Sequence, residues 1–513
     1  MPVRVGVFGW GIVAPKAPNI DVFRERLQSA ESWLTPFNGF GPDNFLVGDP
    51  EFSFADYQEW IGTRFAPRHY QKLKEKMDSP ALYAIGAFIQ SLNQNPGIET
   101  ELQKLGGEAH VYVGTGLGAL ETTYQASVKL YEAQRQWNRF WAHADHNSAL
   151  RAYLNEPPDS TQEAKDLPSR EDEETWNRYW MERSPELHQY LEELANIDSL
   201  GIDGAIENGK LHAIREREKG RARLQEKWQA PEPPWNVSAN LIWNIHNTPA
   251  AQISILGQIT GLSFAPVAAC STFGVALGLA MRSIQCGLAK AVVVGATDPP
   301  PHPLTVGSFY NARVLSADRK LSLPLTRLKG THVAGGSVVW IVGDLDFMTA
   351  RGFRPLGMEP LAVGVSSDAD HIITPSDEGP KIAIEQALEL SHAQAGDIGS
   401  WDLHATATPG DYAEMKTLRS LLTDSVVVTA RKGTFGHGMS AGGGWELTAQ
   451  YLGYEAGKLF PTPLSDKDLN PIIREVHGNF VFDSGCAAPN HLGGKLSMGI
   501  GGVNACVISR PLQ

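Results

Sequence analysis

The sequence predicts an α/β protein of two similar halves, interrupted by one mainly helical insertion. Outside residues 131–230, short β-branched runs alternate with helical patterns. That order is typical of parallel sheets with helices on their faces. Residues 131–230 hold 34 charged side chains and 5 of the 13 tryptophans, but only 4 of the 51 glycines. With 513 residues, the chain also exceeds the roughly 250–300 residues at which one core stops growing.

In the first half, buried strands are expected where apolar, β-branched residues run together, and a helix is expected at Ser79–Leu92. The predicted strands are Val3–Phe8, Ala109–Val113, Ala291–Val294 and Val338–Val342.

The second half begins the same series again. A strand is expected within Arg354–Ser366 and a helix at Gly379–Leu390, much as at the N-terminus. Because the order of elements repeats, we expect an internal duplication. The expected N-terminal half covers residues 1–350 and is interrupted by the insertion near residues 126–235. The expected C-terminal half covers residues 351–513.

The insertion carries local helix signals. Ser184 precedes Pro185 at a first helical position, and apolar residues follow at one-face spacing. A second helix is expected from about Ser169, and the proline-rich stretch 231–234 ends the last one. We expect the tryptophan and tyrosine stripes to be buried faces of these helices. The insertion itself is expected to cap the body.

Charge and cysteine content limit the partners and the compartment. The chain has 57 acidic and 44 basic residues, whereas nucleic-acid binding needs a clustered basic excess. No apolar run reaches the about 18 residues of a membrane span, and the opening MPVRVGVFGW is unlike an export signal. Four cysteines are too few for a disulfide framework. We expect a soluble, cytoplasmic protein with reduced thiols that binds neither nucleic acid nor membrane.

Cys270 is the candidate nucleophile. It lies where a short apolar strand, Phe264 to Ala269, runs into a predicted helix over Ser271–Cys286. A cysteine at such a turn meets the positive end of the helix dipole and free backbone N–H groups. Both features favour a thiolate and offer an oxyanion hole for acyl transfer. A buried core cysteine is the alternative, so partners are needed.

Two histidines downstream are the candidate partners. His404 lies in Asp402-Leu-His-Ala-Thr-Ala-Thr408, and His437 follows Lys432-Gly-Thr-Phe-Gly436. Each histidine stands where a strand gives way to a turn of small residues, so its ring can closely approach a ligand. An imidazole there can move a proton or donate to a developing oxyanion.

Together these segments resemble the β-ketoacyl synthase family, the decarboxylating Claisen condensing enzymes of fatty-acid and polyketide synthesis. Ala269-Cys270-Ser271 resembles the nucleophile motif of that family. His404 to Thr408 matches His-Gly-Thr-Gly-Thr with alanine at both glycines, and Lys432 to His437 matches Lys-x-x-x-Gly-His. Further matches are Met77-Asp78, Gly114-Thr-Gly116, Asp368 to Pro375 and Gly499 to Asn504.

The resemblance implies a thiolase-like, five-layer α-β-α-β-α body, which pairs into a homodimer in that family. It implies that Cys270 takes an acyl group from a carrier-bound thioester. His404 and His437 then hold the carbonyl of a malonyl thioester during decarboxylation, and Lys432 supports His404. The implied partner is an acyl carrier protein with a phosphopantetheine arm, or else CoA carries the acyl group, and no metal or other cofactor is called for.

Substrate-binding roles also follow from the resemblance. Thr406 and Thr408 resemble the pair that hydrogen-bonds the pantetheine arm. The backbone N–H groups of Cys270 and Ile500 are expected to form the oxyanion hole, and Ile500 stands where the family has a gating phenylalanine.

Two departures from the family pattern bear on activity. Gly336 stands where an acid of the family is expected, so Lys432 must find another acid or point elsewhere. Ile500 makes a smaller gate. The alternatives that these changes leave open are a non-condensing acyltransferase and a non-catalytic partner subunit of the chain-length-factor type.

Two other interpretations fit the residues less well. Gly114-Thr-Gly-Leu-Gly118 follows a strand but lacks the spacing and downstream acid of a dinucleotide loop. A thiolase would need a second reactive cysteine near the C-terminus, and Cys506 instead continues an alternation typical of a strand.

A basic cluster is the candidate docking site for an acidic carrier protein on this otherwise acidic chain. A solvated helix face is the alternative interpretation. The cluster comprises Arg64, Arg68, His69, Lys72, Lys74 and Lys76.

Overall fold

The computed structural model describes residues 3–41, 45–156, 167–201 and 206–512, without the side chains of residues 207 and 208. The chain divides into two compact units. We call residues 1–121 and 242–513 the body, and residues 122–241 the insertion unit. Among the helices of the described ranges, none combines the length and apolar character that crossing a bilayer requires.

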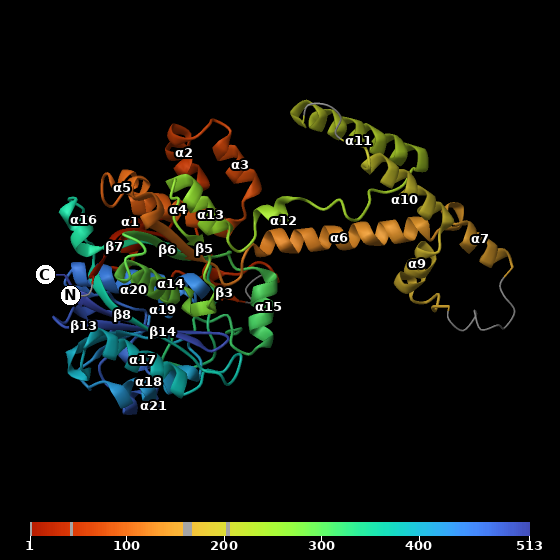
Figure 1. The fold of residues 1–513 in the computed structure, drawn as a ribbon. Coiled ribbons are helices and arrows are strands. Elements are labelled where there is room, and N and C mark those ends of the chain that lie inside the picture. Colours follow the sequence, from red (N-terminus) through yellow and green to blue (C-terminus); the bar gives the residue numbers. More distant parts are fainter. Residues whose placement is uncertain (1–2, 42–44, 157–166, 202–205, 513) are drawn as a thin grey trace. The chain divides into compact units, whose positions relative to one another are not determined.

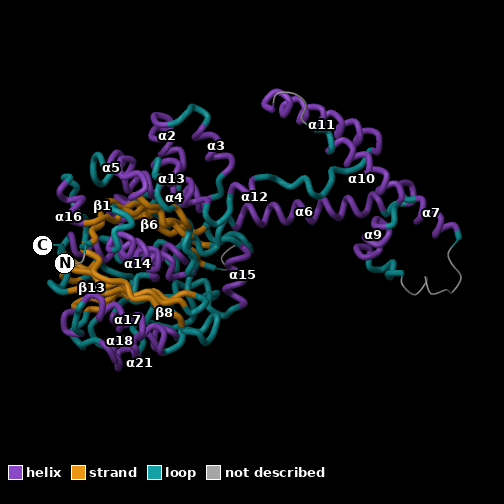
Figure 2. The backbone as a smooth tube through the Cα atoms, viewed as in Figure 1, coloured by secondary structure: helices purple, strands orange, loops and turns teal. Residues whose placement is uncertain are grey.

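The body contains two five-stranded sheets (Figure 2). The first has the order β1-β7-β6-β4-β5, and all of its strands precede residue 350. The second has the order β8-β14-β13-β9-β10, and all of its strands follow that residue. Their bounds are Val5–Val13 (β1), Ala109–Gly114 (β4), Ser263–Phe264 (β5), Ala291–Asp298 (β6), Gly336–Asp344 (β7), Met358–Ser367 (β8), Ile398–Asp402 (β9), Val427–Thr429 (β10), Leu492–Gly499 (β13) and Val503–Pro511 (β14).

The two sheets share one pairing pattern. In each order, the first two pairs of neighbouring strands are antiparallel and the last two are parallel. The expectation of wholly parallel sheets is therefore wrong. In the second sheet the reversal comes from the tight turn between β13 and β14, since strands joined by a hairpin run antiparallel.

Helices form three layers around these sheets (Figures 1 and 2). On the first sheet α4 (Ser79–Leu92) packs against β1 and β7, and α13 (Thr248–Gly257) lies beside it. Between the sheets, α14 (Thr272–Gln285) and α20 (Met439–Glu455) contact each other and reach both β6 and β8. Against the second sheet α17 (Glu378–Ser391) packs on β8 and β14, with α18 (Gly410–Leu421) beside it.

The distribution of apolar residues along the helices explains which of them lie inside the body. Helix α4 has buried residues all round, as a helix between a sheet and another helix should. The remaining helices of the body are shorter: α1 (Ile20–Arg26), α2 (Gln58–Arg64), α3 (His69–Lys76), α5 (Ile98–Leu105), α15 (Pro303–Asn311), α16 (Leu345–Ala350), α19 (Lys432–Phe435) and α21 (Pro471–Val476).

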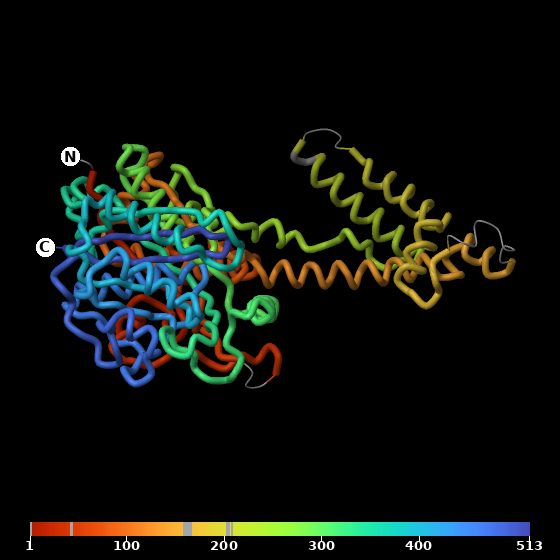
Figure 3. The backbone as a smooth tube through the Cα atoms, turned by 90° about the horizontal axis from the view of Figure 1, so that it is seen from below, coloured from red at the N-terminus to blue at the C-terminus, as the bar shows by residue number. Residues whose placement is uncertain are grey.

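The insertion unit has its own aromatic core. Trp137 and Trp141 of one helix pack with Tyr190 of another, with ring centroids 5.4–5.5 Å apart. The expectation that the aromatic stripes are buried helix faces is confirmed for these rings. Within the unit α10 and α11 run side by side (Figures 1 and 3). Its helices are α6 (Leu120–Trp141, which begins in the body), α7 (Ser148–Asn155), α9 (Glu173–Glu182), α10 (Pro185–Asp198) and α11 (Ile206–Trp228), and α12 (Asn240–Trp243) follows at its end.

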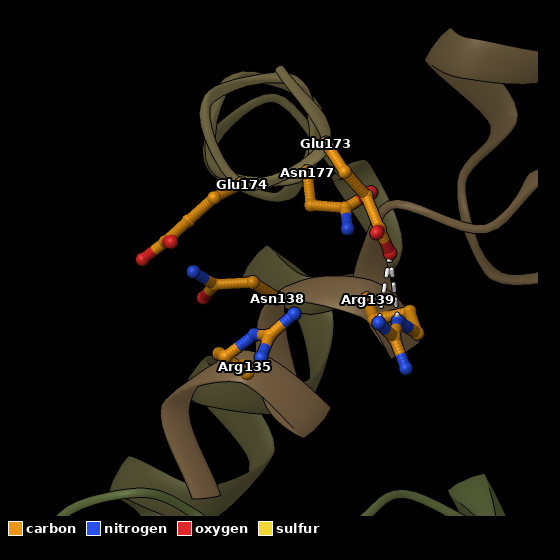
Figure 4. A pocket seen from close by; sticks show the side chains of 6 residues that line it. All are labelled: Arg135, Asn138, Arg139, Glu173, Glu174 and Asn177. Carbon is orange, nitrogen blue, oxygen red and sulfur yellow. Dashed lines mark hydrogen bonds and ion pairs between the residues drawn. The ribbon is translucent and has the colours of Figure 1, made fainter. Parts of the chain in front are cut away.

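An ion pair joins α6 to α9 at the surface of this unit. Arg139 Nη2 lies 2.8 Å from Glu173 Oε1 (Figure 4). The small polar cleft around this pair has a volume of about 10 Å³, enough for one water molecule.

Candidate active site

One cavity of about 510 Å³ in the body collects six of the residues that the sequence singles out. It lies among the ends of β9 and β13, the start of α18 and the turn before α14. The structure brings to its lining Cys270, His404, Thr406, Thr408, His437 and Ile500.

Cys270 lies at a strained elbow before α14. Residues Ala269–Ser271 form a single 3₁₀ turn, and Ala269 has a φ of 46°, a region that L-residues with a Cβ rarely adopt. The turn is held by Ala268 N–H, which donates to Thr272 Oγ1 at 2.9 Å, and by Ser271 Oγ, which donates to Val503 O at 2.7 Å. Strain of this kind costs about 1–3 kcal/mol and persists only where the surroundings enforce it.

The thiol of Cys270 is more basic than the sequence suggests. The helix N-terminus predicts a lowered pKa, but burial raises the pKa of Cys270 to about 11. The N–H of Ile500 and the Lys432 ammonium oppose this rise without overcoming it. The pKa of Cys270 is therefore shifted in the direction opposite to the one that the helix start predicts, because desolvation of the anion outweighs the backbone donors and the Lys432 charge.

The turn after β13 presents backbone donors to the sulfur. Both the Ile500 N–H and the N–H of Cys270 itself approach the thiol. A Cβ on Gly499 would lie 2.8 Å from Ala268 O and 3.3 Å from Cys270 N, so this close approach requires glycine. The Ile500 side chain is 42% exposed and lines the cavity.

Two buried carboxylates shape the loop that carries His404. Glu414 accepts hydrogen bonds from the N–H groups of His404 at 2.7 Å and Ala405 at 2.8 Å. Asp411 accepts from Thr406 N at 2.8 Å. Burial raises the pKa of Glu414 to about 7 and that of Asp411 to about 6. Sequence reasoning missed both acids, although Asp411 lies in the first turn of α18, where an acid is a usable signal.

The two threonines of this loop form a polar edge of the cavity. Thr406 Oγ1 and Thr408 Oγ1 lie 3.0 Å apart, and both side chains are half-buried. Between them Ala407 has a φ of 59°. This left-handed conformation explains why glycine suits that position in the family pattern, and alanine there adds strain.

The two histidine rings meet edge to face. Their centroids are 5.4 Å apart and their planes differ by 85°. The loop of His437 is fixed by its own N–H, which donates to His332 O at 2.7 Å. Burial, and then the charge of Lys432, lowers the pKa of both imidazoles well below the usual value. Both rings are therefore neutral at pH 7, each with one N–H donor and one acceptor nitrogen.

Lys432 lies behind the histidines and has an acid partner. Its Nζ is 2.7 Å from Glu446 Oε1 of α20 and also donates to His404 O. Gly336 supplies no acid: a Cβ there would lie 2.1 Å from Val13 O. Glu446 therefore replaces the acid expected at that position. The sequence reasoning missed it because the pair joins residues from different elements.

The predicted docking cluster lies away from the cavity lining. Arg64 is held by Glu99 at 2.8 Å and stacks over Trp60. Lys72 and Lys74 are exposed on α3, and Arg68 is exposed just before that helix.

The arrangement can carry out covalent acyl transfer. A cysteine thiol, two neutral imidazoles and two backbone N–H groups converge on one cavity with an apolar lining. Backbone donors stabilise the tetrahedral oxyanion, and the imidazoles can accept the thiol proton or donate to an enolate oxygen.

Comparisons with known proteins agree with this geometry. Residues 208–345 match the β-ketoacyl synthase N-terminal domain, and residues 359–464 match the β-ketoacyl synthase C-terminal domain. The 3-oxoacyl-[acyl-carrier-protein] synthase 2 of Rhizobium meliloti (strain 1021) is 28% identical over 321 residues, which are 60% of this chain and 71% of that protein. The enzyme of the same name from Vibrio harveyi is 30% identical over 247 residues, 46% of this chain and 58% of that protein.

A solved structure shows the same fold. The ishigamide ketosynthase/chain length factor superposes with a TM-score of 0.70 over 100% of both chains, at 16% identity. Two domain models therefore match in the expected order along the two halves, and the fold is that of the ketosynthases. The chain belongs to the β-ketoacyl synthase family.

Proposed function

We propose that the chain is an active β-ketoacyl synthase that acts on carrier-bound thioesters. The observation that carries this proposal is the convergence of Cys270, His404 and His437 on one cavity. In the first step the Cys270 sulfur attacks the acyl thioester carbonyl and loses its proton to a neutral imidazole. The tetrahedral oxyanion faces the N–H groups of Cys270 and Ile500. The carrier thiol then leaves with that proton.

The second step forms the carbon–carbon bond. A malonyl thioester loses carbon dioxide by cleavage of its carboxylate C–C bond, and the electron pair becomes an enolate. The N–H groups of His404 and His437 stabilise the enolate oxygen. The enolate carbon attacks the acyl-Cys270 carbonyl, and the Cys270 thiolate leaves and takes up one proton from solvent. The product is a β-ketoacyl thioester. Its chain length, and whether it enters fatty-acid or polyketide synthesis, lies outside this proposal.

A two-substrate assay tests the proposal. The protein is incubated with an acyl carrier protein bearing a short acyl chain and with the same carrier bearing malonate. We expect a carrier whose mass corresponds to the β-ketoacyl product, together with stoichiometric carbon dioxide. Acyl transfer without this product would instead identify a non-condensing acyltransferase, and no reaction with any carrier would identify a non-catalytic partner subunit.

We infer that α3 docks the carrier protein. Lys72 and Lys74 present two ammonium groups on one exposed helix, and carrier proteins are acidic. The variant Lys72→Glu/Lys74→Glu should raise KM for carrier-bound substrate and leave KM for a small thioester unchanged. Equal effects on both substrates would exclude this docking site.

We infer that the protein forms a homodimer through the β5 edge of the first sheet. Strand β5 is the last strand of that sheet, and Leu262 and Val267 on either side of it are 55% and 59% exposed. A sheet edge flanked by apolar side chains is a ready site for pairing with a second copy.

We further propose a cytoplasmic location. Cys286 and Cys486 are free, exposed thiols, which persist in a reducing compartment. Labelling of both thiols in intact cells with a membrane-permeant reagent, but not with an impermeant one, would agree with this location.

A further inference from the structure

A second buried lysine, which the proposed reaction does not use, lies behind the histidines. Lys495 belongs to β13 and its side chain is 1% exposed. Its Nζ lies 2.8 Å from Glu446 Oε2 and 3.2 Å from Leu403 O.

The two lysines share one carboxylate. Lys432 binds Oε1 of Glu446 and Lys495 binds Oε2. Lys432 also donates to the carbonyl of His404, and Lys495 donates to the carbonyl of the preceding residue, Leu403. The two lysines therefore hydrogen-bond to two consecutive backbone carbonyls, those of Leu403 and His404, in the segment that leads into the cavity.

The ion pair with Glu446 does not by itself account for the second ammonium, because Lys432 already pairs with that carboxylate. Taking a further charge out of water is costly unless other interactions offset it.

We propose that Lys495 is a positioning residue of the reaction, which fixes Glu446 opposite Lys432, holds the Leu403 carbonyl next to His404, and adds a second buried positive charge to that of Lys432 behind the two histidines. The proposal rests on the function proposed above, because neutral imidazoles must accept the Cys270 proton in its first step.

The positive charge of Lys495 favours the deprotonated form of every neighbouring titratable group considered below. The Lys495 charge lowers the pKa of both imidazoles, after burial and the charge of Lys432, and for His404 also after the effect of His437. It also opposes the burial that raises the pKa of Asp402 to about 6 and of Glu414 to about 7. Removing Lys495 therefore makes each of these groups easier to protonate. The charged and titratable groups around the two rings are Asp402, Asp411, Glu414, Arg431, Lys432, Glu446 and Lys495.

The pH profile of Cys270 acylation tests this role. In Lys495→Met, we expect the acid-side midpoint of the acylation rate to rise by about one pH unit, the lower end of what a nearby charge produces. Lys495→Arg keeps the charge and should retain the wild-type midpoint. Lys290→Met removes another lysine, whose ion pair with Asp344 (3.1 Å) lies at the first sheet, and should leave the profile unchanged.

A double variant keeps the test decisive if Lys495→Met does not fold. Lys495→Met/Glu446→Gln removes one charge of each sign, so the net charge beside Lys432 is the same as in the wild type. Its acid-side midpoint should return toward the wild-type value.

Two results would overturn the role of Lys495. A folded Lys495→Met protein with a wild-type midpoint would show that Lys495 is only structural. A double variant whose midpoint is raised as far as in the single variant would exclude the charge effect. If wild-type protein is not acylated at any pH, the proposed function itself fails, and the two failures are thereby distinguished.

Discussion

At Cys270 the balance between burial and the helix end decides the state of the nucleophile. The side chain is 6% exposed, and its thiol keeps its proton in the resting protein because burial raises its pKa. A protonated sulfur limits side reactions with solvent oxidants, which attack thiolates. Activation must therefore accompany substrate binding, when a neutral imidazole accepts the proton.

Alkylation kinetics should report this protonation state. Because the pKa of Cys270 is raised to about 11, its rate with iodoacetamide should climb about tenfold per pH unit from pH 7 to 10 without a plateau. The rate is measured by intact mass, with Cys270→Ala to subtract alkylation of exposed Cys286 and Cys486. A plateau below pH 8 would show a preformed thiolate.

The motif residues could be predicted from the sequence, but their buried partners could not. Cys270, His404 and His437 are reactive side chains in turns of small residues, which is a local signal. Glu446 and Lys495 lie on α20 and β13 and meet only because both elements pack behind the cavity. Such a pairing depends on tertiary packing, and no local pattern reports it.

At the scale of elements, the turn between β13 and β14 positions the Ile500 N–H. Gly501 and Gly502 both have left-handed φ values, 91° and 75°. A Cβ at Gly502 would lie 2.8 Å from Asp368 Cβ, whereas a Cβ at Gly501 meets nothing within 4 Å. A substitution at Gly501 therefore introduces backbone strain alone, whereas one at Gly502 introduces backbone strain and a steric clash.

Alanine substitutions at these positions should differ in effect. Gly501→Ala should cost about 1 kcal/mol of unfolding free energy through backbone strain alone. Gly502→Ala adds the clash with Asp368 and should also slow Cys270 acylation, because the Ile500 N–H shifts. Urea unfolding and acylation rates measure both effects. Equal acylation rates in the two variants would contradict the positioning role of this turn.

Element positions were more predictable than strand directions. The helix expected at Ser79–Leu92 has those bounds, and the one expected at Gly379–Leu390 spans Glu378–Ser391. The first is buried nearly all round and has a capping acid before Ser79-Pro80, and the second carries one apolar face. Strand direction depends on which strands become neighbours, and alternation or β-branching does not encode that choice.

At the scale of the whole molecule, the repeated halves explain where the chemistry lies. Helices α14 and α20 share the layer between the two sheets and contact each other. The first follows the Cys270 elbow, and the second begins just after His437 and carries Glu446. The two-sheet arrangement therefore places the nucleophile on the N-terminal side of residue 350 and the histidines and their supporting charges on the C-terminal side.

The dimer is testable at the β5 edge. Leu262→Asp/Val267→Asp should convert a wild-type dimer into a monomer of about 56 kDa at micromolar concentration, because each buried apolar side chain contributes about 1.5–3 kcal/mol. Size-exclusion chromatography with light scattering measures the mass. Ile472→Asp, at an exposed position on α21, is the matched control and should remain dimeric. A dimeric double variant would place the interface elsewhere.

The central claim is that Cys270 carries the acyl group, and intact-protein mass after incubation with acyl carrier thioesters tests it most directly. Wild-type protein should gain the mass of one acyl group and lose it when malonyl carrier is added, while Cys270→Ala should gain nothing. An acyl adduct that persists in Cys270→Ala, or a wild-type protein that no acyl donor modifies, would contradict the claim.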